Sequence, residues 1–282
     1  MYTQHFGLTE SPFTNTLDPH WFYESAAHEE AIARLLYLVE QHRRCGVLVG
    51  PAGTGKSLVL KLLSSQVRRM PAEVVHIDLI GRSGRELLWE TVAALGLAPR
   101  GDDCPRVLWR TLGDHLATNR YVQAPTVVFY DHVDRAEPDA LSAIERLYHT
   151  CAAGETGMTL ILAARGGRTS RATQILSSIA DLQVELLPFD REQTEEYIST
   201  LGNRAGAVEP LFDGPACERI FAESRGVARD INRLCDMSLV AGMADGIRCV
   251  NETIVAAAAE QLHPLRHTAP IFRTRRRAMA EL

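Results

Sequence analysis

The sequence predicts an α/β protein in which a five-stranded parallel sheet, sandwiched by helices, is followed by a small all-helical lid domain. Five short apolar segments alternate with segments of helical periodicity before residue 188. Strands that are apolar along their whole length are typical of a parallel sheet covered by helices on both faces. After residue 190 only helical periodicity continues, so we expect the domain boundary near Pro188, where the last strand ends.

The first expected element after an N-terminal arm is a helix over residues 26–42, with Ser25 as its N-cap. Its apolar face is expected to consist of Ile32, Leu35, Leu36 and Val39. The five strands are expected over residues 45–49, 73–79, 126–130, 158–163 and 182–187. The intervening helices are expected over residues 56–69, from the capping box of Ser83 and Glu86 onward, and over 105–120, 139–151 and 173–178. The lid helices are expected over residues 191–202, 215–224, 228–243 and 251–262.

Composition is that of an ordinary globular protein. The 282 residues are 46% hydrophobic and 23% charged, with a net charge of −5, which disfavours binding nucleic acid through overall charge but leaves a local basic patch open. The six cysteines show no metal-ligand spacing and are expected to be reduced core thiols. The N-terminus lacks the pattern of a signal peptide and no apolar stretch approaches the length of a membrane span, so we expect a cytoplasmic protein.

The strongest motif is a glycine-rich turn between the first strand and the next helix. Its sequence, GPAGTGKS, fits GxxxxGK[ST] without a mismatch. In such a turn backbone N–H groups cradle phosphate oxygens, the lysine reaches the β- and γ-phosphates, and the serine hydroxyl binds Mg²⁺. The expected nucleotide-binding residues are Gly50, Pro51, Ala52, Gly53, Thr54, Gly55, Lys56, Ser57 and Leu58.

An acidic residue, Asp131, ends the third strand in the stretch TVVFYDHVD. We favour a role as the acid that holds Mg²⁺ together with Ser57 over a role as a helix cap. The next residue, His132, stands where a water-orienting carboxylate is usual, and a neutral imidazole carries no charge for that task. Asp134 is the nearest other carboxylate; if the chain stays extended it lies on the same face as His132, but we slightly prefer it as the N-cap of the following helix.

Two arginines are further site candidates. Arg165 follows the fourth strand, where it either senses the γ-phosphate or is a solvated loop residue. Arg229 opens a lid helix whose core face is Ile231, Leu234, Cys235 and Leu239. Because it lies off that face, Arg229 either reaches back over the phosphates and couples nucleotide state to lid position or forms a surface salt bridge.

Three separated motifs resemble the AAA+ ATPases of the general secretion pathway A type. They are the opening MYTQHFGLTESPF with Asp18-Pro19 and Phe22-Tyr23, the turn GPAGTGKS, and RGVARDINRLCDMSLVAGMADG. The resemblance covers about residues 1–262. It implies a P-loop AAA+ fold, ATP and Mg²⁺ as cofactors, and an assembly factor for secretion or pili, although relatives also serve in DNA transposition. It also places Arg229 at the sensor-2 arginine, and Ala228 replaces a proline of the pattern.

Three departures from the family pattern bear on turnover. His132 replaces a glutamate, Arg165 replaces a glutamine, and Arg171 is the only nearby candidate for the arginine that completes a neighbour's site. An arginine finger contributes about 10³ to 10⁵ in rate, so we expect slow hydrolysis with nucleotide binding intact. The alternatives are a nucleotide-gated binding module with little or no hydrolysis, or a DNA-transposition ATPase partner.

The resulting domain scheme has four parts. They are an arm over residues 1–25, a nucleotide-binding domain over 26–188, a helical lid over 189–265 and a basic tail over 266–282. Aromatic residues of the arm are expected either near the nucleotide base or in a core. The tail, with Arg273 to Arg277, is expected to be solvated; the alternative is a handle for a membrane surface or nucleic acid. Expected partners are ATP, a protein of a secretion or pilus machine at the inner membrane, and further copies of the chain.

Overall fold

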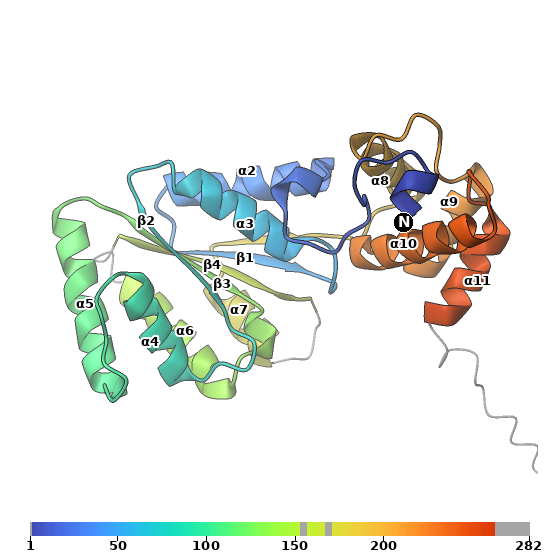
Figure 1. The fold of residues 1–282 in the computed structure, drawn as a ribbon. Coiled ribbons are helices and arrows are strands. Elements are labelled where there is room, and N and C mark those ends of the chain that lie inside the picture. The colour runs from blue at the N-terminus through green and yellow to red at the C-terminus, as the bar shows by residue number, and fades with distance from the viewer. Residues whose placement is uncertain (1, 153–156, 167–170, 263–282) are drawn as a thin grey trace, which may run out of the picture.

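The computed structural model describes residues 2–152, 157–166 and 171–262 and forms a layered α/β domain with a helical domain at one end (Figure 1). The basic tail and Arg273 to Arg277 therefore lie outside the described residues. Within the described ranges, no helix is both long enough and apolar enough to cross a membrane.

The predicted five-stranded parallel sheet is confirmed. Its strands run in the order β2-β3-β4-β1-β5, and every pairing is parallel. Their bounds are β1 (Cys45–Gly50), β2 (Glu73–Asp78), β3 (Thr126–Asp131), β4 (Met158–Arg165) and β5 (Leu182–Glu185). β1 lies between β4 and β5, so the loop that follows β1 leaves from the interior of the sheet rather than from an edge.

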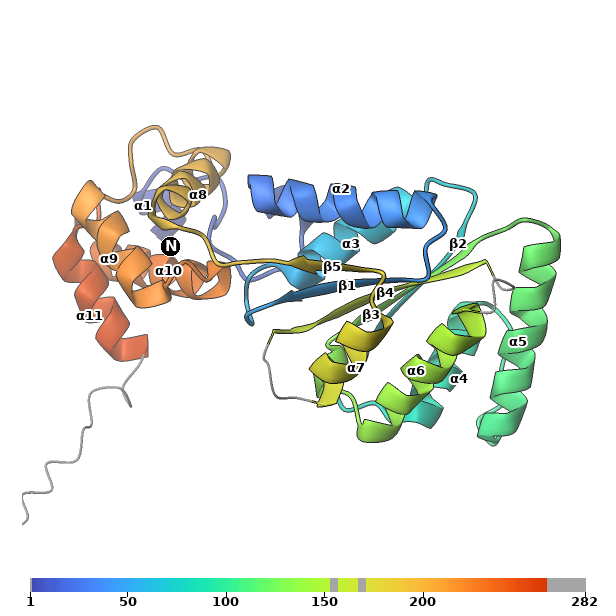
Figure 2. The ribbon, with the colours of Figure 1, turned by 180° about the vertical axis from the view of Figure 1, so that it is seen from behind.

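Helices cover both faces of the sheet (Figures 1 and 2). One face carries α2 (Ala26–Glu40) and α3 (Lys56–Val67). The other carries α4 (Gly84–Ala94), α5 (Pro105–Tyr121), α6 (Pro138–Ala152) and α7 (Arg171–Ile179). Ser25 caps α2 by accepting the N–H of His28, and Ser83 and Glu86 form the predicted capping box of α4. The inner strands β1 and β3 are buried along their whole length because helices cover both faces of the sheet, whereas the edge strands β2 and β5 are partly exposed.

The prediction of the apolar face of α2 was partly wrong. Leu35 and Val39 are buried as expected, whereas Ile32 and Leu36 are only partly buried. Ala31 and Leu38 are buried in their place. In this orientation of the helix its third residue, His28, also faces inward, toward the loop after β1.

The helical domain consists of α8 (Arg191–Arg204), α9 (Gly214–Ser224), α10 (Ala228–Ala244) and α11 (Glu252–Leu262). The four residues predicted for the core face of α10 are all buried. The N-terminal arm, with α1 (Tyr2–His5) and the 3-10 turn η1 (Pro19–Trp21), packs mainly on this domain, whereas Phe22 joins the core between the sheet and helices α2 and α3. Phe13 meets Phe212 edge-on at 6.0 Å between ring centroids. The arm thus completes the core of a domain that begins more than 160 positions later in the chain.

The expectation that the cysteines are core thiols was wrong for two of them. Cys45, Cys217 and Cys235 are buried, but Cys104 and Cys249 are exposed. Cys104 directly precedes α5 and Cys249 lies in the turn after α10, so both belong to connections that run over the surface.

Candidate nucleotide-binding site

A cavity of about 340 Å³ lies at the carboxyl ends of the strands, where ligands bind in open parallel sheets. The arm, the loop after β1, the ends of β3 and β4, and the lid all line it. A volume of this order suits a small molecule.

The loop after β1 forms one wall of the cavity. Ala52, Gly53, Gly55, Lys56, Ser57 and Leu58 line it directly. Of the remaining three predicted residues, Gly50 and Pro51 offer their carbonyls to Lys56, and Thr54 is buried behind the loop with its hydroxyl donating to the Pro51 carbonyl at 3.0 Å. The predicted set therefore divides into six cavity-lining residues and three that shape the loop.

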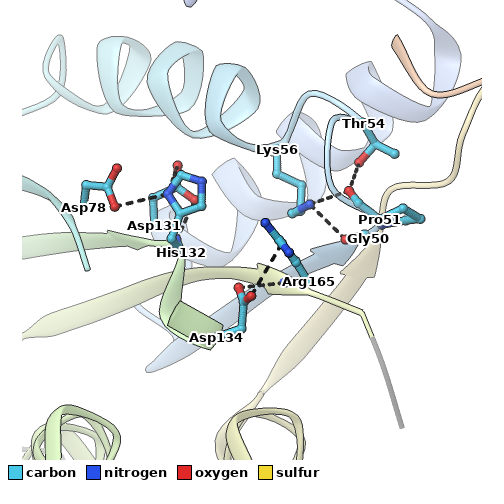
Figure 3. Close-up of polar contacts among 9 residues, drawn as sticks. All are labelled: Gly50, Pro51, Thr54, Lys56, Asp78, Asp131, His132, Asp134 and Arg165. Atoms are coloured by element: carbon cyan, nitrogen blue, oxygen red, sulfur yellow. Dashed lines mark hydrogen bonds and ion pairs between the residues drawn. The ribbon is translucent and has the colours of Figure 1, made fainter. Parts of the chain in front are cut away.

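Lys56 lies inside the loop. Its Nζ donates to the carbonyl oxygens of Gly50 at 2.9 Å and Pro51 at 2.7 Å (Figure 3). Burial lowers the pKa of Lys56, and the carboxylates of Asp131 and Asp134 partly offset this shift. The ammonium group is thus held among hydrogen-bond acceptors at the N-terminus of α3. An anion bound there would also interact with the N–H groups of the first helical turn.

Asp131 ends β3 beside Asp78, which ends β2 in the same register. Asp131 is buried, and its Oδ1 accepts the N–H of His132 at 2.8 Å. The Nδ1 atom of His132 lies 3.2 Å from Asp78 Oδ1 and 3.6 Å from Asp131 Oδ2 (Figure 3). Asp78 was not predicted, because only the pairing of β2 with β3 brings it to the site.

The expectation for Asp134 was wrong on both readings. His132 has φ 55°, so the extended chain ends there and a 3-10 turn, η2 (Val133–Arg135), follows. Asp134 does not cap α6, which begins at Pro138. Its Oδ1 accepts the N–H of Arg165 at 3.0 Å, and its Oδ2 lies 3.7 Å from Arg165 Nε. The turn directs this carboxylate at the end of β4.

The two contacts with Asp134 also fix the position of Arg165. Its side chain is half-exposed, lines the cavity and extends from the end of β4 toward Lys56 (Figure 3). It is therefore a cavity residue tethered at its backbone and its guanidinium, rather than a free loop residue.

Arg229 lies on the opposite, lid side of the cavity. It is the second residue of α10, and its backbone N–H donates to the Gly53 carbonyl at 3.1 Å. Among the described residues no carboxylate pairs with its guanidinium. Arg171, the candidate for a finger, opens α7 and is exposed, and it is not among the described residues that line the cavity.

The far end of the cavity is closed by the arm and the lid. Tyr197 Oη donates to Asn232 Oδ1 at 2.8 Å, and Asn232 Nδ2 reaches the Thr14 carbonyl and Asn15 Oδ1, each at 3.4 Å. Asn15 in turn donates to the Arg229 carbonyl. The sequence offered no signal for this cluster, because the arm and the lid are separated by the whole sheet domain.

Comparisons with known proteins agree with this geometry. Residues 39–171 match the family model described as AAA domain. General secretion pathway protein A of Aeromonas hydrophila is 27% identical over 270 residues, which is 94% of this chain and 49% of that protein. The chain thus spans about half the length of this curated relative.

Several solved structures share the fold at low identity. Cdc6p from Pyrobaculum aerophilum has a TM-score of 0.68 at 18% identity, over 89% of this chain and 70% of that one. A chain of the Drosophila ORC bound to DNA has a TM-score of 0.72 at 15% identity, over 93% and 65%. The Thermotoga maritima RuvB Holliday junction branch migration motor has a TM-score of 0.55 at 16% identity, over 89% and 74%. At these identities the likeness concerns the fold alone.

Proposed function

Because the chain is an AAA ATPase of the general secretion pathway A type, we propose that it binds ATP with Mg²⁺ and hydrolyses it slowly. One observation carries the proposal. A loop lysine, a strand-end carboxylate and two arginines, from parts of the chain far apart in sequence, converge on one cavity. Cations around a cradle of backbone N–H groups fit a triphosphate, whose charge they would neutralise.

The chain's own groups fit both cofactors. Lys56 already donates to two carbonyl oxygens, which phosphate oxygens, as charged acceptors, would outcompete. Ser57 and Asp131 would hold Mg²⁺, whose preferred ligands are oxygens and which usually takes one or two carboxylates beside substrate phosphates. When bound, the metal would neutralise charge between the β- and γ-phosphates. Arg165 and Arg229 would approach the γ-phosphate from the sheet side and the lid side.

His132 is proposed to orient the attacking water, with Asp78 as the residue that holds it. An ionised carboxylate can only accept a hydrogen bond, so the contact with Asp78 keeps the proton on Nδ1 and leaves Nε2 as the acceptor. A neutral acceptor orients water less strongly than a carboxylate would, and the slow rate follows from this difference.

Steady-state phosphate release by the purified protein tests the proposal. We expect slow turnover by the wild type, none by Lys56→Ala, and an increase of about tenfold to a hundredfold with His132→Glu. This increase is smaller than most of the range of about 10² to 10⁴ for a positioned general base, because His132 already orients the water in part. Absence of Mg-ATP binding by the wild type would overturn the proposal. Binding without turnover, unchanged by His132→Glu, would instead identify a nucleotide-gated binding module.

The process served by ATP is proposed from the relative's name. General secretion pathway protein A suggests that this chain acts on a protein assembly for secretion or pili, on the cytoplasmic side where ATP is available. Copurification of such an assembly with the wild type in the presence of ATP, but neither with the Lys56→Ala variant nor with the wild type after ATP is exhausted, would support a nucleotide-dependent partner. Copurification independent of nucleotide would contradict this step.

A further inference from the structure

A buried histidine outside the catalytic groups contacts the phosphate-binding loop from behind. His28 is the third residue of α2 and is 4% exposed. Its Nε2 lies 3.1 Å from the Thr54 carbonyl oxygen, and its Nδ1 lies 2.6 Å from Ser25 Oγ. Its ring packs against those of Phe22 and Phe189, with centroids 5.5 Å and 5.7 Å away. A histidine enclosed in this way is held in one orientation.

The partners of the ring determine which nitrogen carries the proton. A carbonyl oxygen can only accept, so Nε2 must carry the hydrogen that is donated to Thr54. Nδ1 is then the acceptor for the Ser25 hydroxyl, whose oxygen also accepts the N–H of His28 at 3.3 Å. Burial lowers the pKa of His28, which favours the neutral form that this arrangement requires. The imidazole is thus a fixed single donor aimed at the loop.

The carbonyl that His28 holds belongs to the peptide bond before Gly55. This bond is trans, and in a planar trans peptide the C=O and N–H groups point in opposite directions. With the Thr54 oxygen directed outward at His28, the Gly55 N–H is directed to the other side of the loop, where Gly55 lines the cavity. A hydrogen bond to the carbonyl also polarises the amide and strengthens its N–H as a donor.

The space behind Gly55 confirms how closely the ring approaches. A Cβ atom at this position, which has φ 95°, would lie 2.8 Å from His28 Nε2. The ring therefore occupies the place that any side chain at residue 55 would need. The loop cannot move outward without displacing His28, and His28 is in turn enclosed by the arm and by Phe189 after β5.

We propose that His28 is a positioning residue for phosphate binding: its Nε2–H holds the Thr54 carbonyl outward and so keeps the Gly55 N–H directed at the phosphate. This inference rests on the proposed nucleotide binding. His28 does not touch the nucleotide and acts only through the loop. His28 also connects the loop to the junction between sheet and lid. Its ring contacts that of Phe189, whose backbone N–H donates to the Gly226 carbonyl at 2.9 Å.

Two amide substitutions separate the donor function from simple filling of the space. In His28→Gln the amide nitrogen is as many bonds from the backbone as Nε2 and keeps a donor for Thr54. In His28→Asn the amide is one bond shorter, so it retains polarity but cannot reach that carbonyl. His76→Asn is the matched control, because His76 is a half-buried histidine of β2 that packs on Phe129 and does not line the cavity.

The measurements are the affinities for Mg-ATP and Mg-ADP by titration calorimetry and the melting temperature of each variant. We expect His28→Asn to weaken both affinities about tenfold, the factor for losing one hydrogen bond to a charged group. His28→Gln should stay within about threefold of wild type, and His76→Asn should bind as wild type does. A rescue by glutamine at equal melting temperature is a result that a merely structural role would not produce.

The outcomes keep this inference apart from the proposed function. If the wild type binds nucleotide and His28→Asn binds it equally well, the inference is wrong and the proposed function stands. Equal losses in both amide variants, in step with lowered melting temperatures, would also overturn the inference by showing a structural role alone. If the wild type itself binds neither nucleotide, it is the proposed function that fails, and the inference fails with it.

Discussion

The contact between Gly53 and the lid provides a test of how the glycine-rich loop after β1 and the lid are coupled. Gly53 has φ 90°, and its carbonyl accepts the N–H of Arg229 at 3.1 Å. A Cβ atom at residue 53 would lie 2.8 Å from Arg229 Cβ and 2.9 Å from Val227 Cγ1. Arg229 Cβ is fixed to the backbone of α10, and Val227 is the N-cap residue of that helix, so relieving the clash requires the lid or the loop to move.

The expected cost of Gly53→Ala follows from two contributions. A left-handed conformation costs a residue with a side chain about 1–2 kcal/mol. Losing the Gly53–Arg229 hydrogen bond as the lid moves costs about 0.5–1.5 kcal/mol. Together they give about 1.5–3.5 kcal/mol, a factor of roughly ten to three hundred in an equilibrium constant. We therefore expect a lower melting temperature and Mg-ATP affinity reduced at least tenfold, because Arg229 moves away with the lid.

Calorimetric melting and nucleotide titration measure the two effects, and Gly246→Ala is the control. Gly246 follows α10 with φ 72°, and no atom lies within 4 Å of a Cβ added there. Its substitution carries the backbone strain of about 1–2 kcal/mol without the contact, so affinity should be unchanged. If Gly53→Ala and Gly246→Ala lower stability equally and both bind nucleotide as wild type does, the reasoning about the loop–lid contact is refuted.

Three further predictions concern the contacts around the site. Replacing Asp134 by alanine should slow phosphate release and cost about 0.5–1.5 kcal/mol of folding stability, because the exposed backbone N–H at the end of β4 loses its protein partner; an unchanged unfolding midpoint in denaturant would contradict this. Asn232→Ala should destabilise by about 1–3 kcal/mol by leaving the buried Tyr197 hydroxyl unpaired, and adding Tyr197→Phe should recover part of the loss in a double-mutant cycle. Thiol labelling of the native protein at pH 8 should modify the exposed Cys104 well before Cys217, because burial raises the pKa of the Cys217 thiol to about 11 and only thiolates react; equal rates would contradict the burial.

Local patterns accounted for most of the secondary structure. The strand beginnings at residues 45, 73, 126, 158 and 182 were predicted from apolar runs alone, because a fully covered parallel strand needs only a short continuous apolar segment. The capping box of α4 was equally local, since its two partners are three residues apart. The rotation of α2 was missed because periodicity does not reveal that a histidine is needed on the inner face.

The site residues also fall into those that local patterns predicted and those that they did not. The identity of the loop residues and of Asp131 was clear from the sequence, whereas the roles of their neighbours were not. Asp134 was misjudged because a left-handed residue, His132, turns the chain at the end of β3. A single histidine with φ near 55° has no reliable signature in a sequence, and its effect on the next carboxylate depends on where β4 ends.

By itself, then, the sequence determined the α/β architecture with its helical domain, the glycine-rich loop after β1 and the acid that ends β3, because each arises from neighbouring residues. Only the tertiary structure decided which groups complete the site. Asp78 meets His132 across 54 positions, Asp134 holds Arg165 across 31, and His28 reaches Thr54 across 26. Such contacts depend on strand order, helix rotation and the return of the arm to the lid, and none of these is written in a local pattern of residues.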